Sequence, residues 1–342
     1  MARYIPILRF MRGERVGLQH LSAAGRHNVA PIFVLAPKQF VGKKETKNNA
    51  AVPAPNMIAN EIMTAWGTGP FYLDASALPA AGGHHPIVDI AAACRAIGLH
   101  LIPATPLHVA APYQHGIQSV SASDNRGVAL RVDLNEFSAA AQWMPHWPFP
   151  LGTTDIVVDV SDNAPMVASL GAAVTNVFHA LPSAGQWRSV TIAGTSMPEN
   201  FTGLVAGKHI IPRSEVALWQ MLAAAQLPYQ IDFGDYASIS TTPPPSGIAW
   251  GFPINVRYTL ATDFLVCRGV ATTGFGGVDM APQLTSHANT IRQHAGRTPL
   301  AHCWADGVID AIAANGASPQ GLEHWVQLGV NRHVELVRHL LP

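Results

Sequence analysis

The sequence has few charged residues and no excess of either sign. Asp, Glu, Lys and Arg together make up 12% of the 342 residues, about half the usual share in soluble domains. The 21 basic residues balance 21 acidic ones. So little charge is not typical of a disordered chain or a coiled coil. Without a basic excess, nucleic acid is not expected to be the main partner.

Long apolar runs, a signal sequence and paired cysteines are also missing. Mean hydropathy is slightly positive at +0.17, yet no apolar run approaches the roughly 20 residues that span a bilayer. Arg9 interrupts the first apolar stretch, so no signal-peptide core is expected there. Cys94, Cys267 and Cys303 lie far apart, without the spacing of a zinc site. These features predict a soluble, cytoplasmic protein with no membrane partner.

Short apolar, β-branched runs alternate with longer Ala-rich segments, a pattern typical of β-α units around a parallel sheet. Eight strands are predicted, at Tyr4–Phe10, Pro31–Leu35, Phe71–Asp74, His100–Ala104, Val128–Asp133, Asp155–Asp159, Ser189–Ala193 and Tyr229–Phe233. Helices are predicted between them, at Glu14–Ala24, Asn56–Trp66, Pro86–Ile97, Tyr113–Ser121, Asn135–Trp143, Asn163–Leu181 and Ser214–Ala225.

Two parallel architectures could use these elements, a closed (β/α)8 barrel and an open doubly wound sheet. No Gly-x-Gly-x-x-Gly follows any of the predicted strands, which removes the usual fingerprint of the open sheet. Polar residues gather at the carboxyl ends of nearly every strand, where a barrel builds its site. The sequence therefore favours an α/β fold, with a (β/α)8 TIM-like barrel over residues 1–240.

The remaining residues, 241–342, interrupt this rhythm and are expected to form a β-hairpin and helical extension packed on the barrel. Residues 241–253 are rich in proline and are typical of a linker. A hairpin is predicted from Asn255–Leu260 and Phe264–Gly269. Helices are predicted at Pro282–Ala295, Asp306–Asn315 and Leu322–Leu341. Within the barrel, residues 38–55 are interpreted as a loop at the active face or as a disordered segment.

A barrel would bring the polar residues at its strand ends to one mouth. The groups expected there are Arg9, Lys38, Asp74, Asp133, Asp159, Asp162, Glu199, Asp232 and Asp235. Carboxylates with one or two nearby cations can bind a divalent metal or act as acid and base, so Asp159, Asp232 and Asp235 are the catalytic candidates. The same residues could instead cap the following helices and form turns.

The arginines of the predicted hairpin are candidates for binding an anion. Arg257 and Arg268 lie in otherwise apolar segments, and such an arginine needs a carboxylate or phosphate partner. Asp232 or Asp235 would be a sufficient structural partner. The 16 histidines include no His-Glu-x-x-His or similar spacing, so no zinc site is predicted and no residue is assigned as a metal ligand. The sequence leaves the cofactor undetermined.

Several motifs follow one another along essentially the whole chain. They are Tyr4-Ile-Pro-Ile-Leu-Arg9 with Gly13-Glu14, Ala30-Pro-Ile, Asp232-Phe-Gly-Asp235-Tyr236, Asn255-Val-Arg257-Tyr258-Thr259, Phe264-Leu-Val-Cys-Arg268-Gly269, Cys303-Trp304-Ala-Asp306 and Trp325-x-x-x-Gly329-x-Asn331-Arg332-His333. In their order and spacing these motifs resemble the beta protein family of phage satellites, prophages and bacterial defence loci.

The resemblance implies a role in a phage-satellite immunity module, where the beta protein is linked to suppression of a host-killing partner. It adds Tyr258 to Arg9, Arg257 and Arg268 as candidate ligand-binding residues. One departure concerns the second strand, where Phe33-Val-Leu-Ala-Pro-Lys38 stands in place of an expected Pro-Leu-Ile-Glu. The acidic partner expected for Arg9 is missing there, which weakens a catalytic pair at this position.

The sequence and the resemblance therefore indicate two alternative functions. The first is a defence or immunity protein that uses its barrel scaffold to bind a partner or a phage-derived signal. The partner is expected to be a protein, such as a toxin or defence component encoded nearby, or a small anionic ligand. The second is a barrel enzyme acting on a small phosphorylated or nucleotide-like substrate through the arginines and carboxylates above. An enzyme should gather these groups in one pocket, whereas a binding module should have a mouth closed by paired Arg–Asp bridges.

Overall fold

The computed structural model describes residues 2–37, 54–242, 253–274 and 276–341. Eight parallel strands close into a barrel, which confirms the predicted (β/α)8 fold. The strands in order around the barrel are β1 (Tyr4–Arg9), β2 (Ile32–Val34), β3 (Phe71–Asp74), β4 (Leu101–Pro106), β5 (Val128–Val132), β6 (Thr154–Asp159), β7 (Ser189–Gly194) and β9 (Ile231–Asp235). Closure is completed where β1 pairs with β9 on one side and with β2 on the other.

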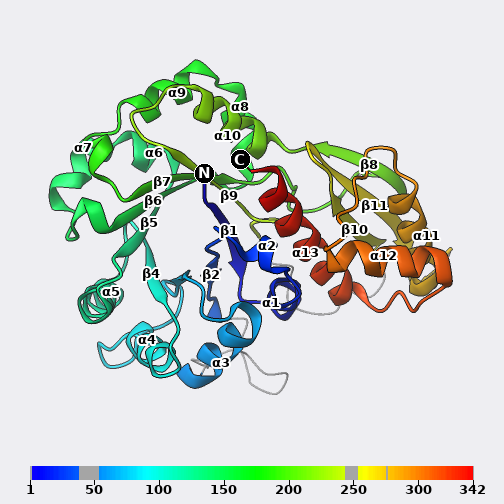
Figure 1. Ribbon diagram of the computed structural model, residues 1–342, viewed down its shortest axis with the longest axis horizontal. Helices are drawn as coiled ribbons and strands as arrows, with labels where there is room; N and C mark the ends of the chain where they lie inside the picture. The colour runs from blue at the N-terminus through cyan, green and yellow to red at the C-terminus, as the bar shows by residue number, and fades with distance from the viewer. Residues whose placement is uncertain (1, 38–53, 243–252, 275, 342) are drawn as a thin grey trace.

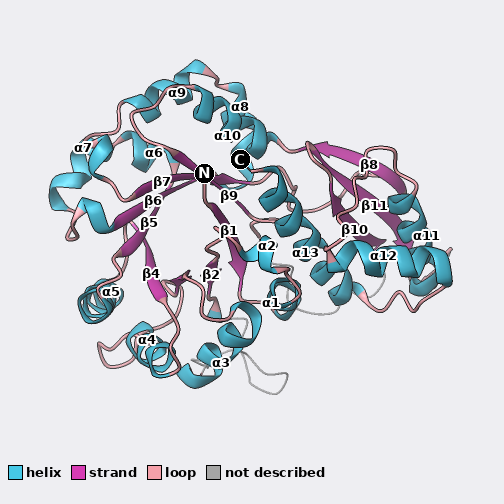
Figure 2. Ribbon diagram, viewed as in Figure 1, coloured by secondary structure: helices cyan, strands magenta, loops and turns pink. Residues whose placement is uncertain are grey.

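Helices surround the strands and cover their outward faces (Figure 2). They are α1 (Arg12–Gln19), α2 (Ala23–Arg26), α3 (Pro55–Trp66), α4 (Ile87–Ala96), α5 (Ala111–Asp124), α6 (Leu134–Ser138), α7 (Ala140–Trp143), α8 (Ala164–Ser169), α9 (Ala172–His179) and α10 (Ser214–Ala224). Alternate strand residues such as Leu130 and Val158 pack with Phe178 and Leu222 of these helices. The strands read as continuous apolar runs because both of their faces are buried.

Three predicted helices are each divided in two, and local backbone chemistry explains two of the breaks. Gly171 adopts a φ of 52° between α8 and α9, a conformation that interrupts a right-handed helix. Between α1 and α2, the Ser22 side chain accepts a hydrogen bond from the backbone N–H of Gly25 and so starts a new helix.

A second unit lies beside the barrel (Figure 1). It contains a three-stranded antiparallel sheet in the order β10 (Pro253–Thr259), β11 (Asp263–Ala271), β8 (Gly207–Pro212), together with α11 (Met280–Arg292) and α12 (Trp304–Asn315). The hairpin of β10 and β11 confirms its prediction. β8 was not predicted. Within the described ranges it is an edge strand whose one partner is β11, and its residues are exposed or half-buried, so it lacks the apolar signal of the other strands.

The last helix, α13 (Leu322–Leu340), lies between the barrel and the second unit and contacts both. On the barrel side it packs against α1, α2 and β1, and on the other side against β10 and α12. Its buried polar side chains bond to both units. The bonds are Asn331 Nδ2 to Gly17 O, Arg332 to Asp306 at 2.8 Å, His333 Nε2 to Asp235 at 2.6 Å, and Ser22 N to Glu335 at 2.6 Å.

The boundary predicted at residue 240 separates barrel strands from the hairpin, and the structure adds two connections across it. β8 precedes that boundary in the chain but belongs to the sheet of the second unit. α13 follows it but covers β1 of the barrel. Within the described ranges, none of the helices combines the length and hydropathy that a bilayer-spanning segment requires.

A cluster of ions and hydroxyls fills the barrel at the amino ends of its strands. Asp155 is almost completely buried and accepts hydrogen bonds from Arg188 at 2.5 and 2.9 Å and from the Tyr72 hydroxyl at 2.7 Å. Arg3 bridges Asp155 and Asp232. Burial alone would raise the pKa of Asp155, but the bonds and charges of the two arginines outweigh it and lower that pKa.

Replacing Asp155 with alanine should therefore destabilise the barrel strongly. Asp155→Ala leaves Arg3 and Arg188 facing a site without its carboxylate, which we expect to cost about 3–5 kcal/mol of unfolding free energy. Urea denaturation at pH 7 measures this loss. The control is Asp89→Ala, which removes an exposed carboxylate paired with His84 and should cost less than about 0.5 kcal/mol. A loss below about 1 kcal/mol for Asp155→Ala would show that the cluster behaves like a surface ion pair.

Candidate functional site

The centre of the barrel mouth is occupied by an ion-pair network rather than an open pocket. Arg131 of β5 donates to Asp74 of β3 at 2.5 Å and to Asp159 of β6 at 2.8 Å. The Tyr236 hydroxyl also donates to Asp159, at 2.5 Å. Burial and the charge of Asp159 both raise the pKa of Tyr236. The backbone N–H of Ser161 donates to the other oxygen of Asp159 at 2.9 Å. Asp159, predicted as a catalytic candidate, is thus neutralised by Arg131 and oriented by these hydrogen bonds.

The other two catalytic candidates lie elsewhere. Asp232 is the second residue of β9, and it bonds to Arg3 at the amino end of the barrel, opposite the mouth. Asp235 lies in the layer between β9 and α13, where it accepts hydrogen bonds from Tyr4 and His333, each at 2.6 Å. Burial would raise the pKa of Asp235, but His333, Arg213 and Tyr4 together lower it. The three carboxylates do not share a site.

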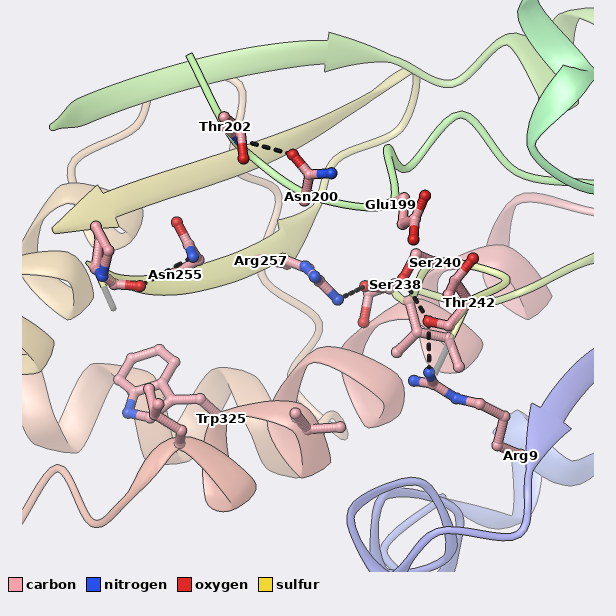
Figure 3. Close-up of a pocket in the computed structure, with 14 residues that line it drawn as sticks. Arg9, Glu199, Asn200, Thr202, Ser238, Ser240, Thr242, Asn255, Arg257 and Trp325 are labelled. Atoms are coloured by element: carbon pink, nitrogen blue, oxygen red, sulfur yellow. Dashed lines mark hydrogen bonds between the residues drawn. The ribbon is translucent and has the colours of Figure 1, made fainter. Parts of the chain in front are cut away.

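A cavity of about 570 Å³ opens where the carboxyl end of β1 meets the second unit. It is bordered by the loop after β7, the loop after β9, strand β10 and the first turns of α13 (Figure 3). Its polar lining consists of Arg9, Glu199, Asn200, Thr202, Ser238, Ser240, Thr242, Asn255 and Arg257. Its apolar lining consists of Ile239, Pro253, Leu322, Trp325 and Val326.

Arg257 is a cation without a counter-ion in this cavity. Its Nη1 donates to the backbone carbonyl of Ser238 at 3.2 Å, and its guanidinium lies 5.2 Å from the centre of the Phe201 ring. No carboxylate pairs with it among the residues that the structure describes. Burial and the charge of Arg9 lower the pKa of Arg257 to about 10, so it stays protonated at neutral pH.

Arg9 approaches the same cavity from the end of β1 (Figure 3). Its Nε donates to Glu14 at 2.9 Å and its Nη1 to the carbonyl of Thr242 at 3.0 Å. Glu14 is buried, and its second carboxyl oxygen has no partner within the described ranges. Burial raises the pKa of Glu14 to about 7 despite the charge of Arg9. Near neutral pH, Glu14 therefore neutralises Arg9 only in part, and the cavity keeps a positive charge.

The remaining candidate residues do not line the cavity. Arg268 of β11 lies beside β10 and donates to Asn255 at 3.3 Å. The Tyr258 hydroxyl bonds to Asp306 at 2.7 Å within the packing between β10 and α12. Asp232 and Asp235 were weighed as structural partners for the hairpin arginines, and in the structure they bond to other groups. Of the four predicted ligand-binding residues, Arg9 and Arg257 are brought together.

Several residues of the site were not identified from the sequence. Arg131 closes the mouth, and its position inside the apolar run Val128–Val132 is the same signal that drew attention to Arg257. The polar loop at 238–242 and the exposed Leu322 have no sequence pattern that separates them from ordinary surface residues. Residues 38–53, including Lys38, and 243–252 of the predicted linker lie outside the described residues. Elsewhere in the structure, no group of three or more His, Cys, Asp or Glu residues could hold a metal ion.

Comparison with known proteins identifies the family. A family model with the description Beta protein matches residues 4–339, nearly the whole chain. The chain belongs to the Beta protein family, which confirms the resemblance of its motifs. No curated protein matches the sequence closely enough to serve as a relative.

The buried Glu14 predicts a pH-dependent stability. Its carboxyl releases a proton near pH 4.5 in the unfolded chain but only near pH 7 in the folded protein. Between these values the folded state binds more protons, so stability falls as pH rises. Glu14→Gln removes this titration. From pH 5 to pH 8 the wild type should therefore lose roughly 2–3 kcal/mol of unfolding free energy relative to the variant.

Urea unfolding of both proteins at the two pH values measures this difference. The matched control is Glu323→Gln, because Glu323 is half exposed and pairs with the exposed Arg12. That variant should follow the wild type at both pH values. If the wild type and Glu14→Gln lose the same unfolding free energy between pH 5 and pH 8, the raised pKa of Glu14 is contradicted.

Proposed function

We propose that this member of the Beta protein family is a phage- or mobile-element-associated defence or immunity protein that works by binding a small anionic ligand between Arg9 and Arg257. The observation that carries the proposal is the uncompensated charge of Arg257, a partly buried cation facing a second cation across a cavity. Withdrawing an ion from water costs several kcal/mol unless a partner compensates it. An anion bound in the cavity would supply that partner.

The chemistry of the two side chains narrows the kind of anion. A guanidinium presents a planar set of donors that matches the oxygens of a phosphate or carboxylate group. α13 also begins at this cavity, with no side chain capping its first turn. The amino end of a helix carries a partial positive charge that favours an anion. These features support a phosphate-bearing ligand.

Catalysis by the predicted carboxylates is less well supported. Asp159 is engaged by Arg131 and Tyr236, and Asp232 and Asp235 lie outside the cavity. A general acid or base must come within hydrogen-bond reach of its substrate. The alternative of a barrel enzyme therefore lacks its proposed acid and base at the site of the arginines. Binding of an anion needs neither a general acid nor a general base. The immunity role that the family resemblance implies adds a protein partner, a toxin or defence component encoded nearby.

Substitution of Arg257 tests the anion site. Arg257→Met keeps the length and apolar stem of the side chain but removes its charge, so the variant should fold at least as stably as the wild type. Inorganic phosphate should raise the melting temperature of the wild type by a few degrees at saturating concentration. It should leave that of Arg257→Met unchanged. Thermal unfolding followed by tryptophan fluorescence measures both temperatures.

The control for this comparison is Lys208→Met, which removes an exposed charge from β8 of the same sheet. It should retain the response to phosphate, because Lys208 does not line the cavity. An equal response of Arg257→Met and the wild type would refute the proposed site.

The biological part of the proposal is tested in cells that carry the gene with its neighbouring genes. If ligand binding serves defence or immunity, Arg257→Met should accumulate to the wild-type level and lose protection, because only the anion site is altered. The measurements are the plating efficiency of phage on each strain and the level of the protein by immunoblot. Full protection by Arg257→Met would show that the immunity role does not depend on the anion site, and would refute this part of the proposal.

A further inference from the structure

The cavity is larger and chemically more varied than a simple anion requires. Its volume of about 570 Å³ falls in the range of sites for organic ligands, about 300–1,000 Å³. The two arginines border one part of it, and the rest is lined by a carboxylate, amides, hydroxyls and an apolar wall. Resting on the proposed function, we infer that the ligand is a nucleotide of nucleoside monophosphate size. Its phosphate lies at Arg9 and Arg257, its sugar hydroxyls at Glu199, and its base along the start of α13.

Glu199 indicates that the ligand carries donors as well as an anion. Its side chain lines the same cavity as Arg9 and Arg257, yet within the described structure it forms no ion pair with either arginine. A carboxylate only accepts hydrogen bonds, and it repels a second anion. It therefore disfavours a ligand that is anionic throughout, such as sulfate or a chain of phosphates. Hydroxyl groups of a sugar would satisfy its oxygens.

Asn200 lies next to Glu199 and supplies a fixed amide. Its Oδ1 accepts a hydrogen bond from the backbone N–H of Thr202 at 2.9 Å (Figure 3). This bond fixes which end of the amide is engaged by the protein and leaves the Nδ2 group as the donor. A donor held in place beside an acceptor can recognise a ligand with both kinds of polar group.

The apolar side chains of α13 that line the cavity favour a ligand with an apolar surface. Leu322 lines the cavity with 41% of its surface exposed, and Val326 follows one turn later on the same helix. Pro253 and Ile239 extend this surface across the cavity. Ile239 is already buried, but a sugar phosphate would leave Leu322 and the half-buried Val326 and Pro253 in water, whereas a flat heteroaromatic base would cover them. The apolar wall therefore favours a nucleotide over a sugar phosphate.

Isothermal titration calorimetry of the full-length protein tests this inference with defined probes. These are sodium sulfate, ribose 5-phosphate, adenosine and the monophosphates of adenosine, guanosine, cytidine and uridine. At least one monophosphate should bind tenfold or more tightly than ribose 5-phosphate. Ribose 5-phosphate should bind more tightly than sulfate, because Glu199 accepts from its hydroxyls. Adenosine, which lacks the phosphate, should bind at least tenfold more weakly than its monophosphate.

Two variants separate the parts of the site. Leu322→Asn should weaken the best monophosphate about tenfold and leave sulfate unchanged. Its matched control is Leu340→Asn, at an exposed leucine near the other end of α13, which should change neither. Glu199→Gln should weaken ribose 5-phosphate and the monophosphate together, while sulfate binds equally or more tightly.

The failures of the two proposals are distinguishable. If sulfate and ribose 5-phosphate bind and no monophosphate binds more tightly, the nucleotide inference is overturned and the anion site stands. Equal binding of the best monophosphate by Leu322→Asn and the wild type would also overturn it. If none of the anions binds, the anion site itself is refuted and the inference falls with it.

Discussion

Buried hydrogen bonds from one turn and a half of α13 fix the second unit against the barrel. Asn331 bonds to α1 and α12, Arg332 to α12, His333 to β9 and β10, and Glu335 to the start of α2. Each of these side chains is at most 1% exposed, and a buried polar group that loses its partner costs about 1–3 kcal/mol. A displacement of α13 would break several of these bonds together. The walls of the cavity, which β1, β10 and α13 supply, are therefore held in one arrangement before any ligand binds.

Charge pairing elsewhere in the protein makes Arg257 exceptional. Arg131, Arg213 and Arg332 are deeply placed cations, and each donates to at least one carboxylate. Among the residues that the structure describes, no carboxylate pairs with Arg26, which instead donates to four backbone carbonyls at the ends of α1 and α3. Arg257 has a single carbonyl and the face of an aromatic ring. In a chain with so few charges, this state of Arg257 is the feature that supports the proposed anion site.

The barrel could be predicted from the sequence because its strands are buried on both faces and stand out as apolar runs. Positions within a strand were harder to predict, and Asp232 illustrates why. The last strand was expected to end at Phe233 but runs from Ile231 to Asp235, so Asp232 lies at its beginning and faces Arg3. Because strand side chains alternate between faces, Asp235 then points to the helix layer. Arg257 is predictable because an arginine in an apolar strand is conspicuous, and Arg9 because it lies at the end of the first strand, but their meeting depends on β10 folding back toward β1.

The candidate site lies on the face where barrel enzymes place their sites, but away from the centre of that face. Barrel enzymes place their sites at the carboxyl ends of the strands, and this cavity is bordered by the end of β1 and by the loops after β7 and β9. The centre of that face is closed by Arg131. Both insertions that build the second unit, β8 after β7 and β10 to α12 after β9, leave the barrel from these same loops. In the proposed function, the inserted unit and α13 would therefore set the ligand specificity. An inference of function from the barrel fold alone would point to the mouth, where the charged residues form ion pairs that serve stability.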